Sequence, residues 1–320
     1  MKLKKILPII GLIFFVYIIY KIGLDKLVVT VRNANLLYLI IGLISTPIFM
    51  LPLIFKWHKI LQMQGFVLDF LYIQRIYYIG AFYGLITPAR TGSLMRAYYI
   101  KNKTKKGIIE CVSSIVIERL IDLFVIFLFA FLGSIIFLNK FTSKFSWTLI
   151  GGFVVFCLFL LIFMNKKITT YVLKLFYNIL LPEKIKEKAD HSLNTFYNNV
   201  PKLKQLFFIF LLTLGTWIFL YFQTFIFAKA FYIEIPFYIF ITFISIGTIV
   251  ATIPISISGL GTREVALITL FSLYNVRPEA IVSMSLISSL GIGIIGSLVG
   301  LFFIYMEGKD EILDYNTISS

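Results

Sequence analysis

Long apolar runs, separated by short stretches rich in lysine, are the feature of this sequence that most restricts its fold. A membrane-spanning helix needs about 20 consecutive apolar residues, and runs of about this length recur along the chain. The strands of a transmembrane barrel would alternate apolar and polar residues, and the sequence shows no such alternation. A helix also satisfies its own backbone hydrogen bonds in lipid. The sequence therefore predicts an all-α integral membrane protein, a polytopic bundle of about 7–8 transmembrane helices.

The predicted spans follow the apolar runs. They cover residues 4–22, 36–55, 110–138, 147–164, 206–231, 236–254 and 279–306. Two further apolar stretches, 71–87 and 260–275, are shorter, and each lies next to a segment with Pro and Gly. A stretch of this kind either crosses the membrane or returns to the side it left as a re-entrant half-helix, and both alternatives stay open.

Lysine-rich stretches set the expected orientation, because cytoplasmic segments carry an excess of Lys and Arg. Residues 101–106 hold four Lys, and residues 165–204 hold eight Lys against three acids. Both segments and the N-terminus are therefore expected in the cytoplasm, with residues 1–306 forming one polytopic domain in the plasma membrane. With both short stretches re-entrant, the short acidic tail 307–320 is expected on the outside.

The basic segment 165–204 is the one sizeable polar part of the chain. Some of its apolar residues recur at helical spacing, which predicts an amphipathic helix on the membrane surface. These residues are Leu173, Phe176, Tyr177, Leu180 and Leu181. The alternative is a solvated cytoplasmic loop whose Lys residues face anionic lipid.

Several function classes are disfavoured by what the sequence contains. A net charge of +15 would suggest nucleic acid in a soluble protein, but here the Lys residues lie mostly between apolar runs, so no nucleic-acid binding is expected. Cys111 and Cys157 lie in or beside apolar runs and are expected to be buried hydrophobes rather than a disulfide. His58 and His191 stand far apart in basic loops, so neither a metal site nor a cofactor is predicted. The sequence has no Walker loop, HExxH or GxGxxG motif, and no catalytic residue is predicted.

Charged side chains inside apolar segments are the second informative feature, because each costs a few kcal/mol in lipid and should face a partner or a cavity. The first cluster follows the stretch 71–87. Pro88 and Gly92 break the helix there, and Arg90 and Arg96 lie near the N-terminus of the next one. Such a terminus favours a phosphate or carboxylate. The alternative is that both Arg lie at the cytoplasmic boundary and only set the topology.

The second cluster is Glu118, Arg119 and Asp122, inside the span 110–138. Glu118 and Asp122 are four residues apart and share one helical face, and Arg119 is placed to pair with Asp122. These three residues are predicted to shape a polar cavity. The alternative is a purely structural charge network between helices.

The third cluster follows Pro254, which ends the span 236–254. Gly259 and Gly261 allow the backbone to turn, and a new helix is expected to start beside them. Arg263 and Glu264 then lie in its first turn, which again places an Arg at a helix N-terminus. A simple hairpin between two spans is the alternative. Because the two broken segments occupy comparable places in the two halves, they indicate a transporter site built from discontinuous helices.

These three stretches, in this order, resemble the lysylphosphatidylglycerol synthase transmembrane region, also called the flippase-like domain family. Members carry a P-x-R-x-G-[ED]-x-x-R-like stretch, then E-R-x-x-D, then P-x-x-x-x-G-x-G-x-R-E. This chain reads PARTGSLMR at 88–96, ERLID at 118–122 and PISISGLGTRE at 254–264. The resemblance covers nearly the whole chain. The first motif departs at Ser93, where the family often has an acid.

The resemblance implies an eight-span-like domain that handles anionic or polyprenyl lipids. In larger bacterial members this domain translocates aminoacylated phosphatidylglycerol, which an attached cytosolic transferase makes. No segment of these 320 residues is expected to form such a transferase, so the resemblance implies a stand-alone member.

The leading hypothesis is a lipid translocase for an anionic phospholipid or a polyprenyl-phosphate-linked lipid. Its lipid-phosphate ligands would be Arg90, Arg96 and Arg263. Glu118, Arg119, Asp122 and Glu264 would balance charge in the cavity. The alternative is a membrane subunit that supplies the lipid site to a separate lipid or polyprenyl-phosphate transferase, and a third hypothesis is a scaffold without transport. Membrane lipids are the expected partners, and a homo-oligomer stays open.

Overall fold

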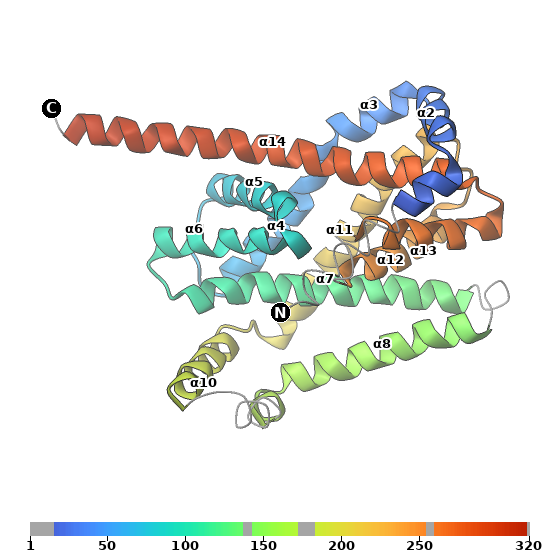
Figure 1. The fold of residues 1–320 in the computed structure, drawn as a ribbon. Coiled ribbons are helices and arrows are strands. Elements are labelled where there is room, and N and C mark those ends of the chain that lie inside the picture. The colour runs from blue at the N-terminus through green and yellow to red at the C-terminus, as the bar shows by residue number, and fades with distance from the viewer. Residues whose placement is uncertain (1–15, 137–142, 172–182, 254–258, 319–320) are drawn as a thin grey trace.

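A computed structural model describes the backbone of residues 16–136, 143–171, 183–253 and 259–318. Some side chains within these ranges lie outside its description, namely those of 86, 88–90, 136, 143–146, 148–149, 164, 183–190 and 307–318. The described residues form helices joined by short connections, with no strand among them (Figure 1). The prediction of an all-α fold is confirmed for this part of the chain.

The helices follow one another closely along the chain. They are α2 (Leu24–Arg32), α3 (Leu36–Ile44), α4 (Thr46–Met63), α5 (Phe70–Ile86), η1 (Pro88–Leu94), α6 (Met95–Thr104), α7 (Ile108–Ile136), α8 (Ser143–Met164), α10 (Glu183–Asn198), α11 (Leu203–Ala230), α12 (Phe237–Thr252), α13 (Thr262–Phe271), η3 (Ser272–Tyr274) and α14 (Pro278–Ile318). Most predicted spans coincide with a helix to within a few residues. The predicted span 4–22 and the expected amphipathic helix around 173–181 fall mostly or wholly outside the described residues.

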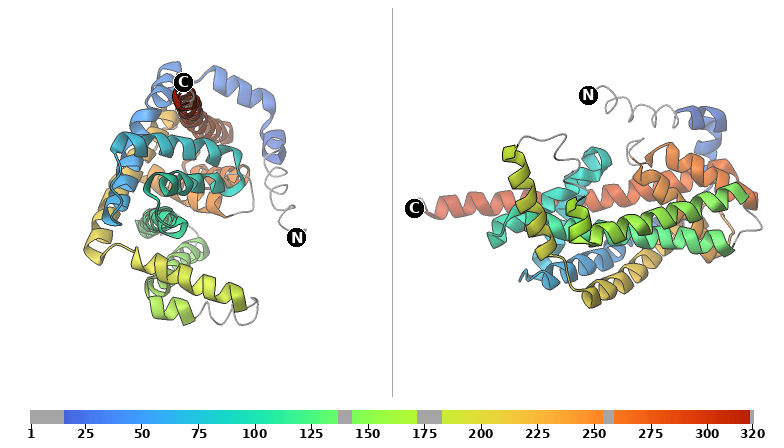
Figure 2. Two further views of the ribbon diagram at one scale, coloured as in Figure 1. Left: turned by 90° about the vertical axis from the view of Figure 1, so that its left-hand side faces the viewer. Right: turned by 90° about the horizontal axis from the view of Figure 1, so that it is seen from below.

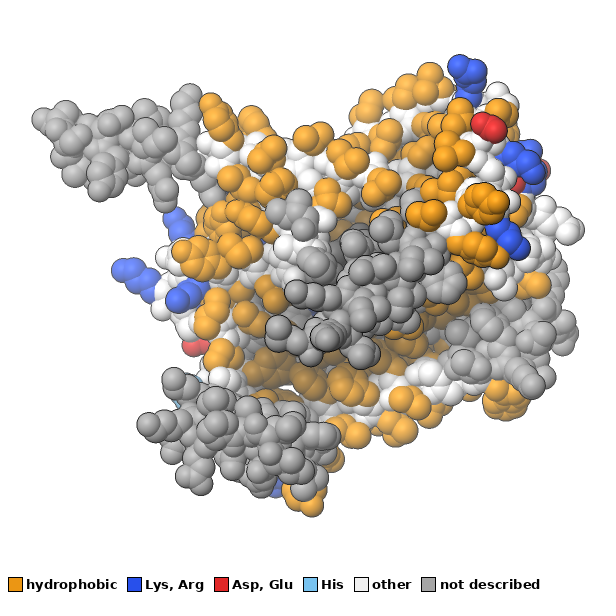
Figure 3. Space-filling model, viewed as in Figure 1, with side chains coloured by type: hydrophobic (Ala, Val, Ile, Leu, Met, Phe, Trp, Pro, Cys, Tyr) orange, Lys and Arg blue, Asp and Glu red, His pale blue; other side chains and the backbone are white. Residues whose placement is uncertain are grey.

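Three described segments are long and apolar enough to cross a membrane: Leu36–Met63, Leu203–Ala230 and Pro278–Met306. The helices α8 and α12 contain shorter apolar segments. Helix α7 has 29 residues, but charged residues interrupt its apolar sequence. Large apolar side chains cover much of the exposed surface, with Lys and Arg gathered towards its ends in the view of Figure 3. These features are those of a membrane protein.

The predicted span 36–55 is shorter than the helical segment that the structure shows there. The span 36–55 continues through a slight break at Ser45 into α4, which ends at Met63. Lys56 and His58 are therefore buried inside a helix, and the prediction that His58 lies in a loop is wrong. The charge of Lys56 suggested that the span ends there. The apolar residues Trp57, Ile60 and Leu61 follow it, however, and they are buried within α4.

Helices α5 and α6 form an antiparallel pair, which we call the first hairpin (Phe70–Thr104). The Tyr72 hydroxyl donates to the carbonyl oxygen of Tyr99 at 3.1 Å, and Gly80 lies directly against the Arg96 side chain. Its two outer ends also meet, because Lys106 Nζ donates to the carbonyl oxygen of Gly65 at 3.2 Å. The chain thus enters and leaves this hairpin at one end of the bundle.

Helices α12 and α13 form a second antiparallel pair, the second hairpin (Phe237–Phe271). Phe243 packs edge-on against Phe271 with ring centroids 5.2 Å apart. Nearer the turn, Gly247 lies against Leu267. The aromatic contact joins the outer part of the hairpin, so this segment also enters and leaves at one end.

The two hairpins enter from opposite ends of the bundle. At one end, which we call the lysine-rich end, Gln64 Nε2 donates to the carbonyl oxygen of Asn199 at 3.0 Å. At the other end, the Asn35 amide donates to the carbonyl oxygen of Ala230 at 2.9 Å. The path α3–α4 therefore runs antiparallel to α11 along the bundle. The first hairpin opens at the lysine-rich end and the second at the other (Figures 1 and 2).

Helix α14 passes both hairpins in order. Ser289 contacts Arg263 of the second hairpin, and Gly293 faces Leu85 of the first. These two positions on α14 are one helical turn apart, about 6 Å along the axis. The turns of the two hairpins, which we call their tips, therefore lie beside neighbouring positions near the centre of Pro278–Met306, the apolar segment of α14.

The same helix carries the described end of the chain to the lysine-rich end. After Gly293, α14 packs along α5 towards the lysine-rich end and continues as a helix to Ile318 (Figure 1). Residues 307–318 thus extend beyond the end at which the Lys stretches lie, whereas the sequence predicted a separate tail on the opposite side. This differs from the expected arrangement because α12, within the predicted span 236–254, packs antiparallel to α13 as half of a hairpin.

Candidate functional site

The tip of the first hairpin is folded by its own short motif. Thr87 adopts an extended backbone before Pro88, and its hydroxyl oxygen accepts from the Gly92 amide at 2.7 Å. The same hydroxyl donates to the carbonyl oxygen of Tyr83 at 2.7 Å. A Cβ at Gly92 would overlap that carbonyl, so glycine is required for this close turn. Helix α6 then starts at Met95 with its N-terminus at the tip.

The tip of the second hairpin uses glycine in a different way. Gly259 and Gly261 have φ angles of 80° and 85°, in the left-handed region that side chains with a Cβ disfavour. Helix α13 starts at Thr262, and the Glu264 carboxylate accepts from the Gly261 amide at 2.6 Å. Pro254, the predicted helix breaker, lies outside the described residues. Both tips therefore present a helix N-terminus, the positive end of the helix dipole, to the inside of the bundle.

Arg263 and Glu264 form the polar group at the second tip. The Arg263 guanidinium donates to Glu264 Oε1 at 2.8 Å and to the Ser289 hydroxyl of α14 at 2.8 Å. Ser285 of the same helix also donates to Glu264 Oε1. Glu264 is fully buried, whereas the Arg263 side chain keeps 16% of its surface exposed. Arg263 therefore remains within reach of a ligand.

Arg96 lies in a closely fitted site near the first tip. Its Nη2 donates to Glu118 Oε2 at 2.8 Å. Its guanidinium contacts two neighbouring aromatic rings, 4.4 Å from the ring centroid of Trp57 and 4.7 Å from that of Tyr77. The side chain is 3% exposed, and its Nη1 atom has no hydrogen-bond partner within the described structure. A buried cationic donor without an acceptor is costly, so this atom is suited to an anionic oxygen or a water molecule.

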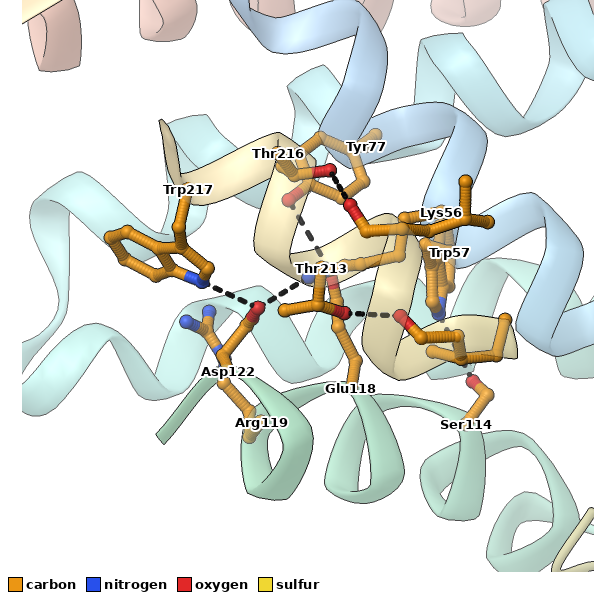
Figure 4. Close-up of polar contacts among 12 residues, drawn as sticks. Lys56, Trp57, Tyr77, Ser114, Glu118, Arg119, Asp122, Thr213, Thr216 and Trp217 are labelled. Carbon is orange, nitrogen blue, oxygen red and sulfur yellow. Dashed lines mark hydrogen bonds and ion pairs between the residues drawn. The ribbon is translucent and has the colours of Figure 1, made fainter. Parts of the chain in front are cut away.

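Lys56 and Asp122 extend this charged group across the bundle. Lys56 Nζ donates to Asp122 Oδ1 and lies 4.0 Å from Glu118 Oε1. Asp122 Oδ1 also accepts from Trp217 Nε1 of α11 at 2.9 Å. We call Lys56, Arg96, Glu118 and Asp122 the charge cluster, and their formal charges sum to zero. Figure 4 shows side chains from α4, α5, α7 and α11 converging on its acidic residues.

Arg119 lies beside the charge cluster (Figure 4) and also contacts the first tip. Its side chain is exposed, although it lies between Glu118 and Asp122 on the helix, and its Nη2 donates to the Ser93 hydroxyl at 3.4 Å. It therefore reaches the first tip. The sequence analysis expected Arg119 to pair with Asp122, but the ion-pair partner of Asp122 is Lys56.

The predicted site residues thus fall into two groups on the two hairpins. Arg96, Glu118 and Asp122 meet in the charge cluster, whereas Arg263 and Glu264 meet at the second tip. Arg90 lies in η1, but its side chain is outside the described structure. The sequence analysis missed several residues of these groups, namely Lys56, Trp57, Tyr77, Trp217, Ser285 and Ser289. The position of Lys56 inside a helix could have been predicted, because Trp57, Ile60 and Leu61 continue the apolar pattern beyond it. Within the described residues, no three His, Cys, Asp or Glu side chains gather as they would around a metal ion.

Comparison with known proteins gives two results. The family model described as "Lysylphosphatidylglycerol synthase TM region" matches residues 5–300. A relative named "UPF0104 membrane protein MJ1595", from Methanocaldococcus jannaschii, is 25% identical over 339 aligned residues, which cover 94% of this chain and 95% of the relative. Both results concern nearly the full length of the chain, so they include both hairpins and the charge cluster.

Proposed function

Because this chain belongs to the family of lysylphosphatidylglycerol synthase transmembrane regions, we propose that it binds the phosphate group of a lipid between its hairpin tips and moves the lipid across the membrane. One observation carries the proposal. Two hairpins enter from opposite ends, and their tips, each with a helix N-terminus and an Arg, lie beside α14 positions that are one helical turn apart.

The charges at the tips favour an anionic oxygen as ligand. Each tip holds the start of a helix, which is the positive end of the helix dipole, and such termini favour phosphate. Arg119 and Arg263 are accessible beside them, and Arg96 holds an unsatisfied Nη1 atom close by. Glu118 accepts from Arg96 and Glu264 accepts from Arg263, so the phosphate would share these two Arg residues with carboxylates. Arg90 is proposed as a further ligand because it belongs to the same tip.

The apolar surface of the protein offers a location for the tail of the lipid. Exposed Leu, Ile, Val and Phe side chains line the outside of the long helices, where acyl or polyprenyl chains remain in the membrane. A phosphate head group therefore needs a polar path through the bundle, while its tail slides along the surface. The half-helices supply irregular backbone inside the protein, which is where membrane proteins tolerate it.

The opposed hairpins also suggest how access alternates. We propose that each hairpin is re-entrant and closes the bundle from one side of the membrane, with the lysine-rich end in the cytoplasm of a plasma-membrane protein. Discontinuous helices that meet near the membrane midplane are typical of secondary transporters, and movement of one half against the other changes the open side. Lys residues at the lysine-rich end would then face the anionic cytoplasmic leaflet.

Flipping of fluorescent phosphatidylglycerol in proteoliposomes tests the proposal. We expect Arg119→Gln and Arg263→Gln each to lower the rate about ten- to hundredfold, because each removes a charge-assisted hydrogen bond to the phosphate. Arg277→Gln is the matched control, since Arg277 is exposed in the connection before α14.

The outcomes separate the hypotheses. If all three variants flip lipid at the wild-type rate, the tips are not the site. If the wild-type protein retains a phosphate-bearing lipid through purification but flips none, the chain is instead a membrane subunit that supplies lipid to a separate transferase.

A further inference from the structure

We propose that a cavity at the lysine-rich end binds a phosphate compound that also carries a hydroxyl, either the head group of a lipid or a free polyol phosphate. The cavity measures about 240 Å³, far more than one water molecule needs, and it lies where α4 and α10 end and α11 begins. Its polar lining residues are Gln64, Asn198, Asn199, Lys202 and Gln205. The cavity is separate from the charge cluster, because Gln64 follows Lys56 by eight residues, about 12 Å along the helix axis.

The cavity lies at the depth of lipid head groups. The apolar segments Leu36–Met63 and Leu203–Ala230 are long enough to cross a membrane, and each has one end beside the cavity. Gln64 directly follows the first segment, and Lys202 directly precedes the second. Polar residues next to the ends of spanning helices meet the head-group region rather than the hydrocarbon. A lipid head group can therefore reach the cavity from the membrane, and a soluble phosphate can reach it from water.

Gln64 contributes a buried acceptor that lacks a partner. Its Nε2 donates to the Ser113 hydroxyl at 2.9 Å and to the carbonyl oxygen of Asn199 at 3.0 Å, which uses both amide protons. Turning the amide by 180° would set its oxygen against the Asn199 carbonyl oxygen, so the orientation is fixed. Oε1 then has no hydrogen-bond partner within the described structure, in a residue that is 8% exposed. Such an acceptor needs a donor, and a ligand in the cavity that Gln64 lines is placed to supply it.

The charges around the cavity select a hydroxyl as that donor. Lys106 Nζ donates to the carbonyl oxygen of Gln64 at 3.4 Å, and Lys202 is an exposed residue of the cavity wall. Glu110, in the first turn of α7, is an acid close to Ser113. The two Lys outweigh this acid, so they repel an ammonium group but not a neutral hydroxyl.

The start of α11 favours an anion next to that hydroxyl. Helix α11 has 28 residues and begins at Leu203, so the positive end of its dipole lies at the cavity. Gln205 Oε1 accepts from the Lys202 amide at 2.8 Å, which holds the first turn in place. A helix N-terminus with a Lys beside it is suited to phosphate. A ligand with its phosphate at the start of α11 and a hydroxyl at Gln64 satisfies both sides of the cavity.

Hydrogen exchange of the full-length protein in phosphatidylcholine nanodiscs tests the site, with protection of residues 198–205 as the readout. One ligand is dihexanoyl phosphatidylglycerol, whose head group carries hydroxyls. The other is dihexanoyl phosphatidylpropanol, which has the same phosphodiester charge and no hydroxyl. We expect the first lipid to protect the segment at about tenfold lower concentration, because only its hydroxyl gives Gln64 Oε1 a hydrogen bond.

Two variants separate the hydroxyl from the charge. Gln64→Met is expected to remove the preference for phosphatidylglycerol, whereas Lys202→Gln should weaken the binding of both lipids about two- to fivefold. Gln62→Met is the matched control, because Gln62 is exposed on α4 two residues before Gln64, and it should keep the preference.

Glycerol 1-phosphate distinguishes the two sources of the ligand. Protection by glycerol 1-phosphate at the same concentration as phosphatidylglycerol would assign a free polyol phosphate to the site, and protection by the lipid alone would assign a lipid head group. Equal protection of the wild type by the two lipids, or protection by none of the three ligands, would overturn the proposal. This comparison needs no variant, so it decides the proposal even if Gln64→Met does not fold.

Discussion

At the scale of single residues, the site is governed by the cost of burying charge. Lys56, Glu118 and Asp122 are almost fully buried, and each has an opposite charge within 4.0 Å. An isolated ion would lose several kcal/mol of hydration there, so pairing makes the cluster tolerable rather than strongly stabilising. Arg96 adds cation–π contacts with Trp57 and Tyr77. Replacing one member of an ion pair should therefore destabilise the protein most when it leaves the other charge buried without a counter-ion.

Lys56→Met is expected to lower the free energy of unfolding by about 3–5 kcal/mol, because Asp122 would remain buried without its counter-ion. Thermal unfolding of the purified protein in detergent measures the effect. The double variant Lys56→Met/Asp122→Asn should recover most of the loss, since it removes both charges and keeps an acceptor for Trp217.

Lys59→Met is the matched control, because Lys59 is only partly buried and its ammonium donates to Gln62 on the protein surface. Its change should stay within about 0.5 kcal/mol. Equal effects of the two Lys variants would mean that the Lys56–Asp122 pair carries no special stability.

At the scale of elements, small residues decide how closely the first hairpin lies against α14. Gly293, Gly296 and Gly300 face Leu85, Ala81 and Tyr78 in turn. Small residues at such spacing allow helix backbones to approach closely in membranes, where packing drives helix association. The contact holds α5 in place while the tip remains a short 3₁₀ turn.

Gly300→Ala is expected to separate α5 from α14, because the new Cβ would overlap the backbone carbonyl of Tyr78. We expect a loss of about 1–3 kcal/mol in thermal stability and a slower rate of lipid flipping. Gly215→Ala in α11 is the control, since its Cβ would meet no atom within 4 Å. It should stabilise the helix slightly. Unchanged unfolding of the Gly300 variant would show that α5 and α14 have room to adjust.

At the scale of the whole molecule, the two hairpins enter the bundle from opposite ends. The first hairpin opens at the lysine-rich end with α4 and α7, and the second opens at the end where α3 meets α11. Helix α14 joins them and emerges beyond the lysine-rich end. The two hairpins thus bring their polar groups to neighbouring positions on one helix from opposite ends.

Cysteine labelling in intact cells checks this topology. In a protein whose Cys111 and Cys157 are replaced by Ser, we expect a membrane-impermeant maleimide to label Glu234→Cys from outside but not Lys103→Cys or Asn316→Cys. Lys103 lies at the lysine-rich end and Asn316 in the extension of α14, whereas Glu234 lies at the opposite end. Labelling of Asn316→Cys from outside would mean that α14 ends on the other side of the membrane.

Much of this molecule could be predicted locally from the sequence. Apolar runs determined that the chain resides in a membrane and where its helices lie, because hydrophobicity and helix breaks are properties of adjacent residues. The motifs at 88–96, 118–122 and 254–264 also determined the family, as the family match confirms. Predicting these features did not require knowing which helices contact one another.

Tertiary structure decided the rest, because the decisive contacts join distant parts of the chain. Lys56 and Asp122 are 66 residues apart, so their pairing depends on how α4 packs against α7. The return of α12 as half of a hairpin, and with it the side of the C-terminus, followed from packing against α13. Apolar residues that face lipid and those that face protein look alike in a sequence, since both environments are nonpolar. The sequence by itself therefore located the charges, and only the packing of helices determined which of them meet.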